Sequence, residues 1–99
     1  MAETIIVINP NSTAAVTAAM DDGLAPLRIA GGPAIECLTL EEGPPGIESQ
    51  SDADGVIAPL CRTIRARDNA ASAFVVACFS DPGLHSAREA TTILRKSAE

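Results

Sequence analysis

The stretch TIIVINP, residues 4–10, decides the fold class of this chain. Its β-branched run predicts a short buried strand, and Asn9-Pro10 predicts the turn that ends it. Asn11, Ser12 or Thr13 can cap a following helix, because a side-chain oxygen accepts a free backbone N–H at a helix start. A strand, a polar turn and a helix in this order form the first part of a parallel βαβ unit.

Two later stretches predict strands of the same kind, Ala34–Leu40 and Ala73–Cys78. Apolar residues at helical spacing over residues 16–27 place a helix between the first strand and the second. Strands separated by helices imply parallel βαβ units, and their crossovers are right-handed. The sequence therefore predicts an α/β fold, a three-layer sandwich with a small parallel sheet.

The ends of two further helices are also predicted. Ser51-Asp52 is a candidate cap for a helix whose apolar face covers residues 57–64, and Pro59 either kinks this helix or delays its start. A third helix is expected from Leu84 to about Arg95. Asp81 would be its N-cap and Pro82 its first helical residue.

Composition excludes several classes of partner. The 99 residues form one domain, and 46% hydrophobic with 20% charged residues is a globular composition. Seven Lys and Arg against thirteen Asp and Glu give a net charge of −6, which argues against nucleic acid. Phe74 and Phe79 are the only aromatic residues, so a base-stacking surface is not expected either. No apolar run has the length of a membrane span, so no membrane partner is expected.

The cysteines and the first residues predict a cytoplasmic protein with reduced thiols. Cys37, Cys61 and Cys78 form an odd set without a C-x-x-C pair, so neither a disulfide framework nor a metal site is expected. The start of the chain has an acid at Glu3, no basic segment and no small-residue cleavage site. A signal peptide is therefore not expected.

In parallel α/β sheets the ligand site lies beyond the carboxyl ends of the strands, here the loops 9–13, 41–51 and 78–83. Cys78 ends a predicted strand just before a predicted helix, where backbone N–H groups and aligned peptide dipoles favour a thiolate. Such a thiolate could be a nucleophile or a general base, and the alternative is a small core residue. Cys37 and Cys61 are expected to pack in the core.

Other polar residues of these loops have two interpretations each. Asn9 and Asn11 could donate amide hydrogen bonds to a carboxylate or imide, and turn and cap chemistry accounts for them equally well. Glu48-Ser49 could contact a ligand, although polar loop residues commonly contact only water. His85 is expected to be a solvated helix residue.

Three blocks carry a resemblance to a known family: INPNST at 8–13, GPPGIES at 43–49, and VACFSDPGL at 76–84, followed by Ala87-Arg88-Glu89. Together they resemble the Asp/Glu/hydantoin racemase family, in particular its hydantoin and allantoin racemase branch. The resemblance extends to about Ala90. It implies that residues 1–90 are the N-terminal α/β lobe, a flavodoxin-like half of a two-lobe racemase fold.

The resemblance also implies a chemistry. Family members are cofactor-independent isomerases, in which one cysteine thiolate removes the proton alpha to a carbonyl and a second cysteine returns a proton to the opposite face. By resemblance Cys78 is the first of these two catalytic groups. Asn9, Asn11 and Ser12, with the backbone N–H groups of Phe79 and Ser80, would bind the substrate oxygens and stabilise the enolate-like charge. The substrate would be a small molecule: a hydantoin, allantoin or an acidic amino acid.

The chain departs from the family after residue 90. Members are more than twice as long, and their second catalytic cysteine has no counterpart here. Residues 91–99 are interpreted as a divergent, apparently truncated tail, which would leave Phe74–Ala77 as an uncovered apolar strand edge. Two expectations follow and stay open. One is that the racemase chemistry belongs to a homodimer that sets one Cys78 against another, or to a longer parent of this chain. The other is that the chain is a catalytically silent lobe that binds ligand weakly at most.

Overall fold

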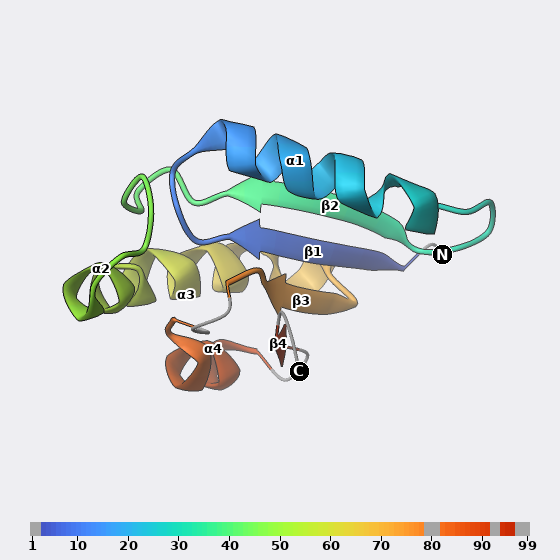
Figure 1. The fold of residues 1–99 in the computed structure, drawn as a ribbon. Coiled ribbons are helices and arrows are strands. Elements are labelled where there is room, and N and C mark those ends of the chain that lie inside the picture. Colours follow the sequence, from blue (N-terminus) through green and yellow to red (C-terminus); the bar gives the residue numbers. More distant parts are fainter. Residues whose placement is uncertain (1–2, 79–81, 92–93, 97–99) are drawn as a thin grey trace.

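The computed structural model describes residues 3–78, 82–91 and 94–96. Its elements are β1 (Thr4–Asn9), α1 (Ala14–Leu24), the 3-10 helix η1 (Ala25–Leu27), β2 (Ala34–Thr39), α2 (Gln50–Gly55), α3 (Ile57–Arg67), the 3-10 helix η2 (Asp68–Ala70), β3 (Ala73–Val76), α4 (Leu84–Ala90) and β4 (Leu94–Lys96). All strand pairs are parallel, in the order β2-β1-β3-β4 (Figure 1). The predicted α/β fold with a small parallel sheet is confirmed.

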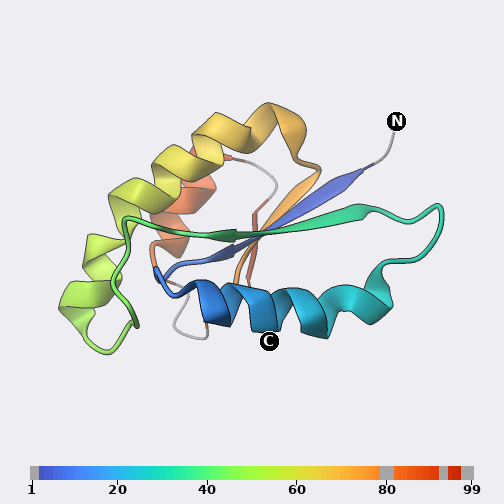
Figure 2. The ribbon, with the colours of Figure 1, turned by 90° about the horizontal axis from the view of Figure 1, so that it is seen from above.

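The sheet is the middle of three layers. Helix α1 lies against one face, and α3 and α4 lie against the other (Figure 2). Side chains of a strand alternate between the two faces. Ile6 and Ile8 of β1 and Phe74 and Val76 of β3 are fully buried and form one core cluster with Leu60 and other residues of α3. The hydrophobic core therefore lies between the sheet and the α3–α4 layer.

Helices α2 and α3 form where one interrupted helix was predicted. Helix α2 ends at Gly55, and α3 begins at Ile57, so Pro59 lies in the first turn of α3. There the missing N–H of proline costs no helical hydrogen bond, and the late helix start is confirmed. The predicted cap at Ser51-Asp52 is wrong, because Ser49 Oγ accepts from the Asp52 backbone N–H at 3.0 Å and caps α2.

The third predicted helix begins at Leu84 as expected but ends earlier. Helix α4 spans Leu84–Ala90, and its N-cap is Gly83 at φ 72°, a left-handed conformation that glycine adopts without strain. The expectation that Pro82 is the first helical residue is thus wrong, because Pro82 lies before the helix, while Asp81 lies outside the described residues. The β-branched run from Thr91 to residue 93 disfavours further helix. Thr91 is extended and buried instead, and its hydroxyl donates to Asp68 Oδ1 at 2.6 Å.

The predicted apolar edge at Phe74–Ala77 is wrong for most of its length. Strand β4 pairs with β3, with Phe74 opposite Leu94 and Val76 opposite Lys96. The outer strands of the sheet are therefore β2 and β4. The domain boundary expected after residue 90 stays a prediction. Among the described residues, no helix is both long enough and apolar enough to span a membrane.

Candidate functional site

A small pocket lies at the carboxyl edge of the sheet. Its volume is about 190 Å³, and it is lined by Asn9, Pro10, Asn11, Val16, Ile47, Ala77 and Cys78. These residues come from the end of β1 and the loop after it, the start of α1, the loop after β2 and the segment that follows β3. The structure thus brings together three of the predicted site residues, Asn9, Asn11 and Cys78, at the edge where the parallel topology places them.

The Asn9 side chain is buried, and it makes hydrogen bonds to the loop that follows it and to α1. It is 1% exposed, and its Nδ2 donates to Asn11 Oδ1 at 2.8 Å and to Thr17 Oγ1 at 3.0 Å, with a longer contact of 3.4 Å to the Thr13 carbonyl. Its Oδ1 accepts from the Asn11 backbone N–H at 3.2 Å. The amide hydrogens of Asn9 are therefore used within the protein, and its predicted contact with substrate stays a prediction.

Asn11 is the amide whose donor is available. Its Oδ1 accepts from Asn9 Nδ2 at 2.8 Å and from the Thr13 backbone N–H at 3.0 Å. Because both neighbours are donors, the oxygen must face them and Nδ2 must lie on the other side of the amide. Within the described part of the chain Nδ2 donates to no other group, so it is free to bind an acceptor in the pocket.

The loop after β2 holds the Asn11 loop in place. The Ser12 backbone N–H donates to the Pro44 carbonyl at 2.8 Å, and Thr13 Oγ1 donates to the Pro45 carbonyl at 2.7 Å. Gly43 approaches so closely that a Cβ there would lie 2.5 Å from the Pro10 carbonyl oxygen. Ser12 does not line the pocket, so its predicted role in substrate binding stays a prediction.

Cys78 follows the last strand pairing of the site. The Ala77 backbone N–H donates to the Ile8 carbonyl at 2.9 Å, and the Cys78 N–H donates to the Val76 carbonyl at 3.1 Å. This tight turn brings Cys78 to the pocket wall, partly buried. Helix α4 begins at Leu84, six residues after Cys78, so the expected support of a thiolate by this helix start stays a prediction. Phe79 and Ser80, the other predicted ligand contacts, lie outside the described residues.

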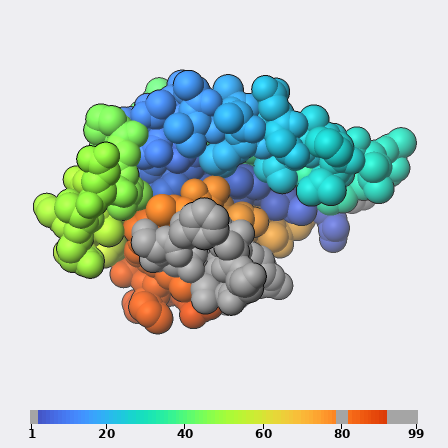
Figure 3. Space-filling view, viewed as in Figure 1, coloured from blue at the N-terminus to red at the C-terminus, as the bar shows by residue number. Residues whose placement is uncertain are grey.

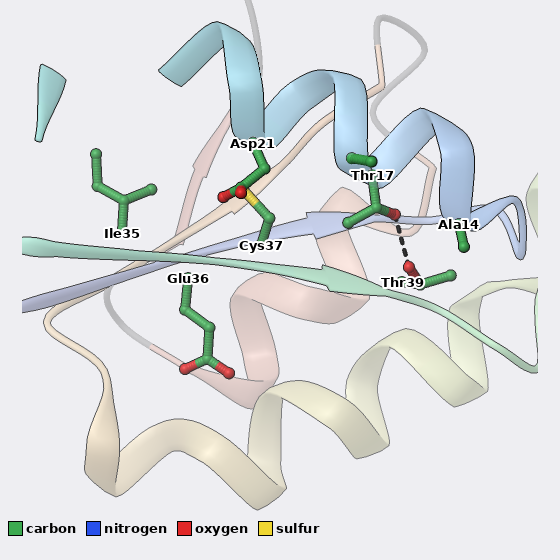
Figure 4. Close-up of a pocket in the computed structure, with 8 residues that line it drawn as sticks. Ala14, Thr17, Asp21, Ile35, Glu36, Cys37 and Thr39 are labelled. Atoms are coloured by element: carbon green, nitrogen blue, oxygen red, sulfur yellow. Dashed lines mark hydrogen bonds between the residues drawn. The ribbon is translucent and has the colours of Figure 1, made fainter. Parts of the chain in front are cut away.

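The two remaining cysteines lie elsewhere. Cys61 is buried on α3, which confirms its predicted core role. Cys37 is only partly buried and points toward Asp21 of α1 (Figure 4), so the prediction of core packing is wrong for this residue. Burial raises the pKa of the Cys37 thiol, the Asp21 carboxylate raises it further, and Arg28 opposes them. Neither cysteine lines the pocket at Cys78.

Two threonines beside the site, Thr17 and Thr39, have no role that the sequence predicts. Thr17 of α1 and Thr39 of β2 line a separate pocket of about 480 Å³ with Cys37, and their hydroxyl oxygens are 2.6 Å apart (Figure 4). Their positions 22 residues apart give no local signal in the sequence. Among the described residues no three His, Cys, Asp or Glu side chains gather as around a metal ion. His85 is exposed on α4, as predicted.

The fold and the site place the chain in a class of proteins: parallel α/β domains that have a cysteine and an amide donor on a pocket at the carboxyl edge of the sheet. Comparison with known proteins gives the family. The Asp/Glu/Hydantoin racemase family matches residues 5–93, and the chain belongs to this family.

Individual relatives agree with this assignment. The chain is 36% identical over 89 residues to a hydantoin racemase of Paenarthrobacter aurescens and 38% identical over 88 residues to a hydantoin racemase of Pseudomonas sp. (strain NS671). Each of these two alignments covers 88% of the present chain. Its structure resembles the allantoin racemase from Klebsiella pneumoniae, with a TM-score of 0.83 and 30% identity over 96% of the chain. The chain spans only 37%, 35% and 39% of these three proteins, respectively.

Proposed function

We propose that this chain supplies one half of a cofactor-independent racemase site, in which Cys78 moves the proton alpha to a carbonyl of a small molecule. The observation that carries the proposal is the shared pocket of Cys78 and Asn11. A thiolate there can take a proton, and an amide N–H beside it can bind the oxygen that gains negative charge. Family membership supports the same chemistry.

The proposed step balances as a simple proton transfer. The Cys78 thiolate removes the alpha proton and becomes a thiol, while the electron pair of the C–H bond moves into the carbonyl to give an enolate-like oxyanion. Asn11 Nδ2 donates to this oxygen, and by resemblance the backbone N–H groups of Phe79 and Ser80 add to it. Hydantoins, allantoin and acidic amino acids all carry a suitable alpha proton. The relatives named hydantoin and allantoin racemases favour the ring substrates.

Inversion needs a second acid on the opposite face of the substrate. The chain has three cysteines, and Cys37 and Cys61 do not line the pocket. The second thiol would therefore come from Cys78 of another copy in a homodimer, or from a further lobe. Without it, the Cys78 thiol could only return the proton to the face from which it came. The alternative function is a catalytically silent lobe that keeps the fold and binds a small ligand weakly at most.

Exchange of the alpha proton of a substrate with solvent distinguishes the racemase half-site from the silent lobe. Enantiopure 5-methylhydantoin is incubated in D2O with the full chain under reducing conditions, and loss of the H5 signal is followed by NMR while optical rotation follows inversion. We expect exchange above the protein-free rate, its loss in Cys78→Ser, and its retention in the matched control Cys37→Ser. Exchange that survives Cys78→Ser contradicts the proposed role of Cys78. No exchange above the protein-free rate supports the silent lobe.

Sedimentation equilibrium, over a range of protein concentrations with reductant present, tests the origin of the second acid. A discrete dimer that also inverts the substrate supports the paired Cys78 site. A monomer that exchanges the proton with retention excludes that pairing and leaves the half-site. Inversion by the Cys78→Ser variant would show that the paired cysteines are not the acid and base.

A further inference from the structure

A series of hydrogen bonds runs from β2 through α1 to the pocket loop. Thr39 at the end of β2 and Thr17 on α1 share a hydrogen bond of 2.6 Å (Figure 4). Thr17 Oγ1 also accepts from Asn9 Nδ2 at 3.0 Å. Asn9 Nδ2 in turn donates to Asn11 Oδ1 at 2.8 Å. The series thus links a position under α1 to the wall of the pocket that contains Cys78.

The donors and acceptors fix the direction of the hydrogen bonds that Asn9 makes. The Thr17 hydroxyl accepts from Asn9, so its single hydrogen is available for Thr39 Oγ1. If the Asn9 amide turned over, its oxygen would face the Asn11 oxygen and its NH2 would face the Asn11 backbone N–H. Both contacts would be repulsive in a site from which water is nearly excluded, since Asn9 is 1% exposed. The two Asn11 contacts therefore select one orientation of Asn9, and Thr17 Oγ1 adds a third contact that holds the amide in that orientation.

Asn9 then determines where the free donor of Asn11 lies. Asn11 Oδ1 is held by Asn9 Nδ2 and by the Thr13 N–H, which leaves Asn11 Nδ2 for the pocket. Thr17 itself does not line that pocket. The hydrogen-bonded route from Thr17 to a ligand there runs through Asn9 and Asn11.

We propose that Thr17 is a positioning residue of the substrate site: its hydroxyl holds Asn9, and through Asn9 it directs the Asn11 Nδ2 donor at the substrate oxygen. The ligand in this inference rests on the proposed function, but the orientation of Asn11 does not. A purely structural role, in which Thr17 only joins α1 to β2, makes a different prediction. In that case Thr39, the other half of the α1–β2 hydrogen bond, would matter as much as Thr17.

Three variants of the full chain separate the two roles. Thr17→Ala removes the acceptor for Asn9, Thr17→Ser keeps it, and Thr39→Val removes only the α1–β2 hydrogen bond. The 15N-labelled chain is titrated with 5-methylhydantoin, and the side-chain NH2 signals of Asn9 and Asn11 are recorded with and without ligand. We expect Thr17→Ala to shift both NH2 signals and to weaken binding about tenfold, the value of one hydrogen bond of about 1.4 kcal/mol.

The other two variants are the controls. Thr17→Ser should retain wild-type NH2 signals and affinity, and Thr39→Val should change the affinity by no more than about twofold, since the Asn9–Thr17 bond remains. Alanine favours a helix more than threonine does, so Thr17→Ala is expected to fold, and Thr17→Val repeats the test with the side-chain volume retained. Thermal unfolding followed by circular dichroism checks each variant.

Two results would overturn the proposal: unchanged Asn11 NH2 signals in Thr17→Ala, or changes in Thr39→Val as large as those in Thr17→Ala. Absence of binding by the wild-type chain would contradict the proposed ligand instead. The NH2 signals of the ligand-free variants would then still decide the role of Thr17, because they report the orientation of Asn9 and Asn11 directly.

Discussion

The two faces of the sheet are held in different ways. Toward α3 and α4, the side chains of Ile6, Ile8, Phe74 and Val76 are fully buried in one cluster. Toward α1 the packing is looser, because no residue of α1 is buried. Figure 3 shows part of β3 at the surface between α1 and α4.

The α1 face has polar and backbone contacts where the other face has apolar packing. Thr17 accepts a hydrogen bond from Asn9 and shares one with Thr39, which joins α1 to β1 and β2. Ser12 and Thr13 join the loop before α1 to the loop after β2. Beside α1 lies an apolar groove of about 440 Å³, lined by Ile5, Val7, Met20, Gly23, Leu24, Leu27, Ile35, Val75 and Ala77. One face of the sheet therefore supplies most of the stability, while the other holds the loops of the site in position.

Truncating one large side chain on each face tests this comparison most directly. Phe74→Ala should lower the free energy of unfolding by about 3–5 kcal/mol, because it leaves a cavity in the fully buried cluster. Met20→Ala on α1 should cost about 1 kcal/mol or less, since Met20 lines the open groove. Urea denaturation at neutral pH measures both. Equal losses would show that the two faces contribute alike.

The second prediction concerns the loop that supports the site. A Cβ at Gly43 would lie 2.5 Å from the Pro10 carbonyl oxygen and 3.1 Å from that of Leu40, both rigid backbone atoms. Gly43→Ala should therefore cost about 2 kcal/mol, through a forced shift of the loop. Gly46→Ala is the matched control, because its Cβ would meet only a Glu48 side-chain atom at 4.0 Å, and it should change stability by less than about 0.5 kcal/mol.

The same two variants also test whether close backbone contacts hold the α1 side of the sheet. If close backbone contacts hold the α1 side, the Gly43→Ala shift must also reach the Asn11 loop, which hydrogen-bonds to the Pro44 and Pro45 carbonyls. Backbone amide signals of Ser12 and Thr13 should then move in Gly43→Ala and stay in place in Gly46→Ala. Unmoved signals with full stability in Gly43→Ala would contradict this account.

The first three strands, their parallel direction and the edge expected to carry the site could be predicted from the sequence. Their β-branched runs are local signals, and the rule for parallel sheets places the loops after them at one edge. Strand β4 could not be predicted in this way, because its three residues pair with β3 only after the chain has turned back through α4. The cap at Ser49 in place of Ser51-Asp52 was missed because several neighbouring polar residues can cap equally well.

The side-chain contacts within the site could not be predicted from the sequence either. Asn9 and Asn11 were assigned the same two roles, and only the structure separates a buried amide with used donors from one with a free donor. The contribution of Thr17 depends on meeting Thr39, 22 residues away. The place of Cys37 in a strand predicts core packing, but the loosely covered α1 face leaves this side chain partly exposed. Such contacts depend on how completely a helix covers a sheet, which periodicity does not report.

The smallest expected effect on the α1 face is a change in the pH dependence of stability, and it comes from the partly buried Cys37 thiol. Its pKa is raised in the folded chain from an ordinary value of 9.0, first by burial and then by the Asp21 carboxylate, against the opposing charge of Arg28. The thiolate is thus disfavoured in the folded state relative to the unfolded one. The stability contributed by the neutral thiol is complete below pH 9 and is lost as the pH rises through the folded-state pKa.

The wild-type chain should therefore lose more stability between pH 8 and about pH 10.5 than Cys37→Ser, whose hydroxyl does not titrate there. The difference in urea midpoint should be small, because solvent screens a partly exposed group. Both proteins share all other titrating groups, so the difference between their midpoints isolates Cys37. Cys61→Ser is not a suitable control, since it places a hydroxyl in the core. If the two midpoints fall in parallel, the thiol is as solvated in the folded chain as in the unfolded one, and the α1 face is more open than its contacts indicate.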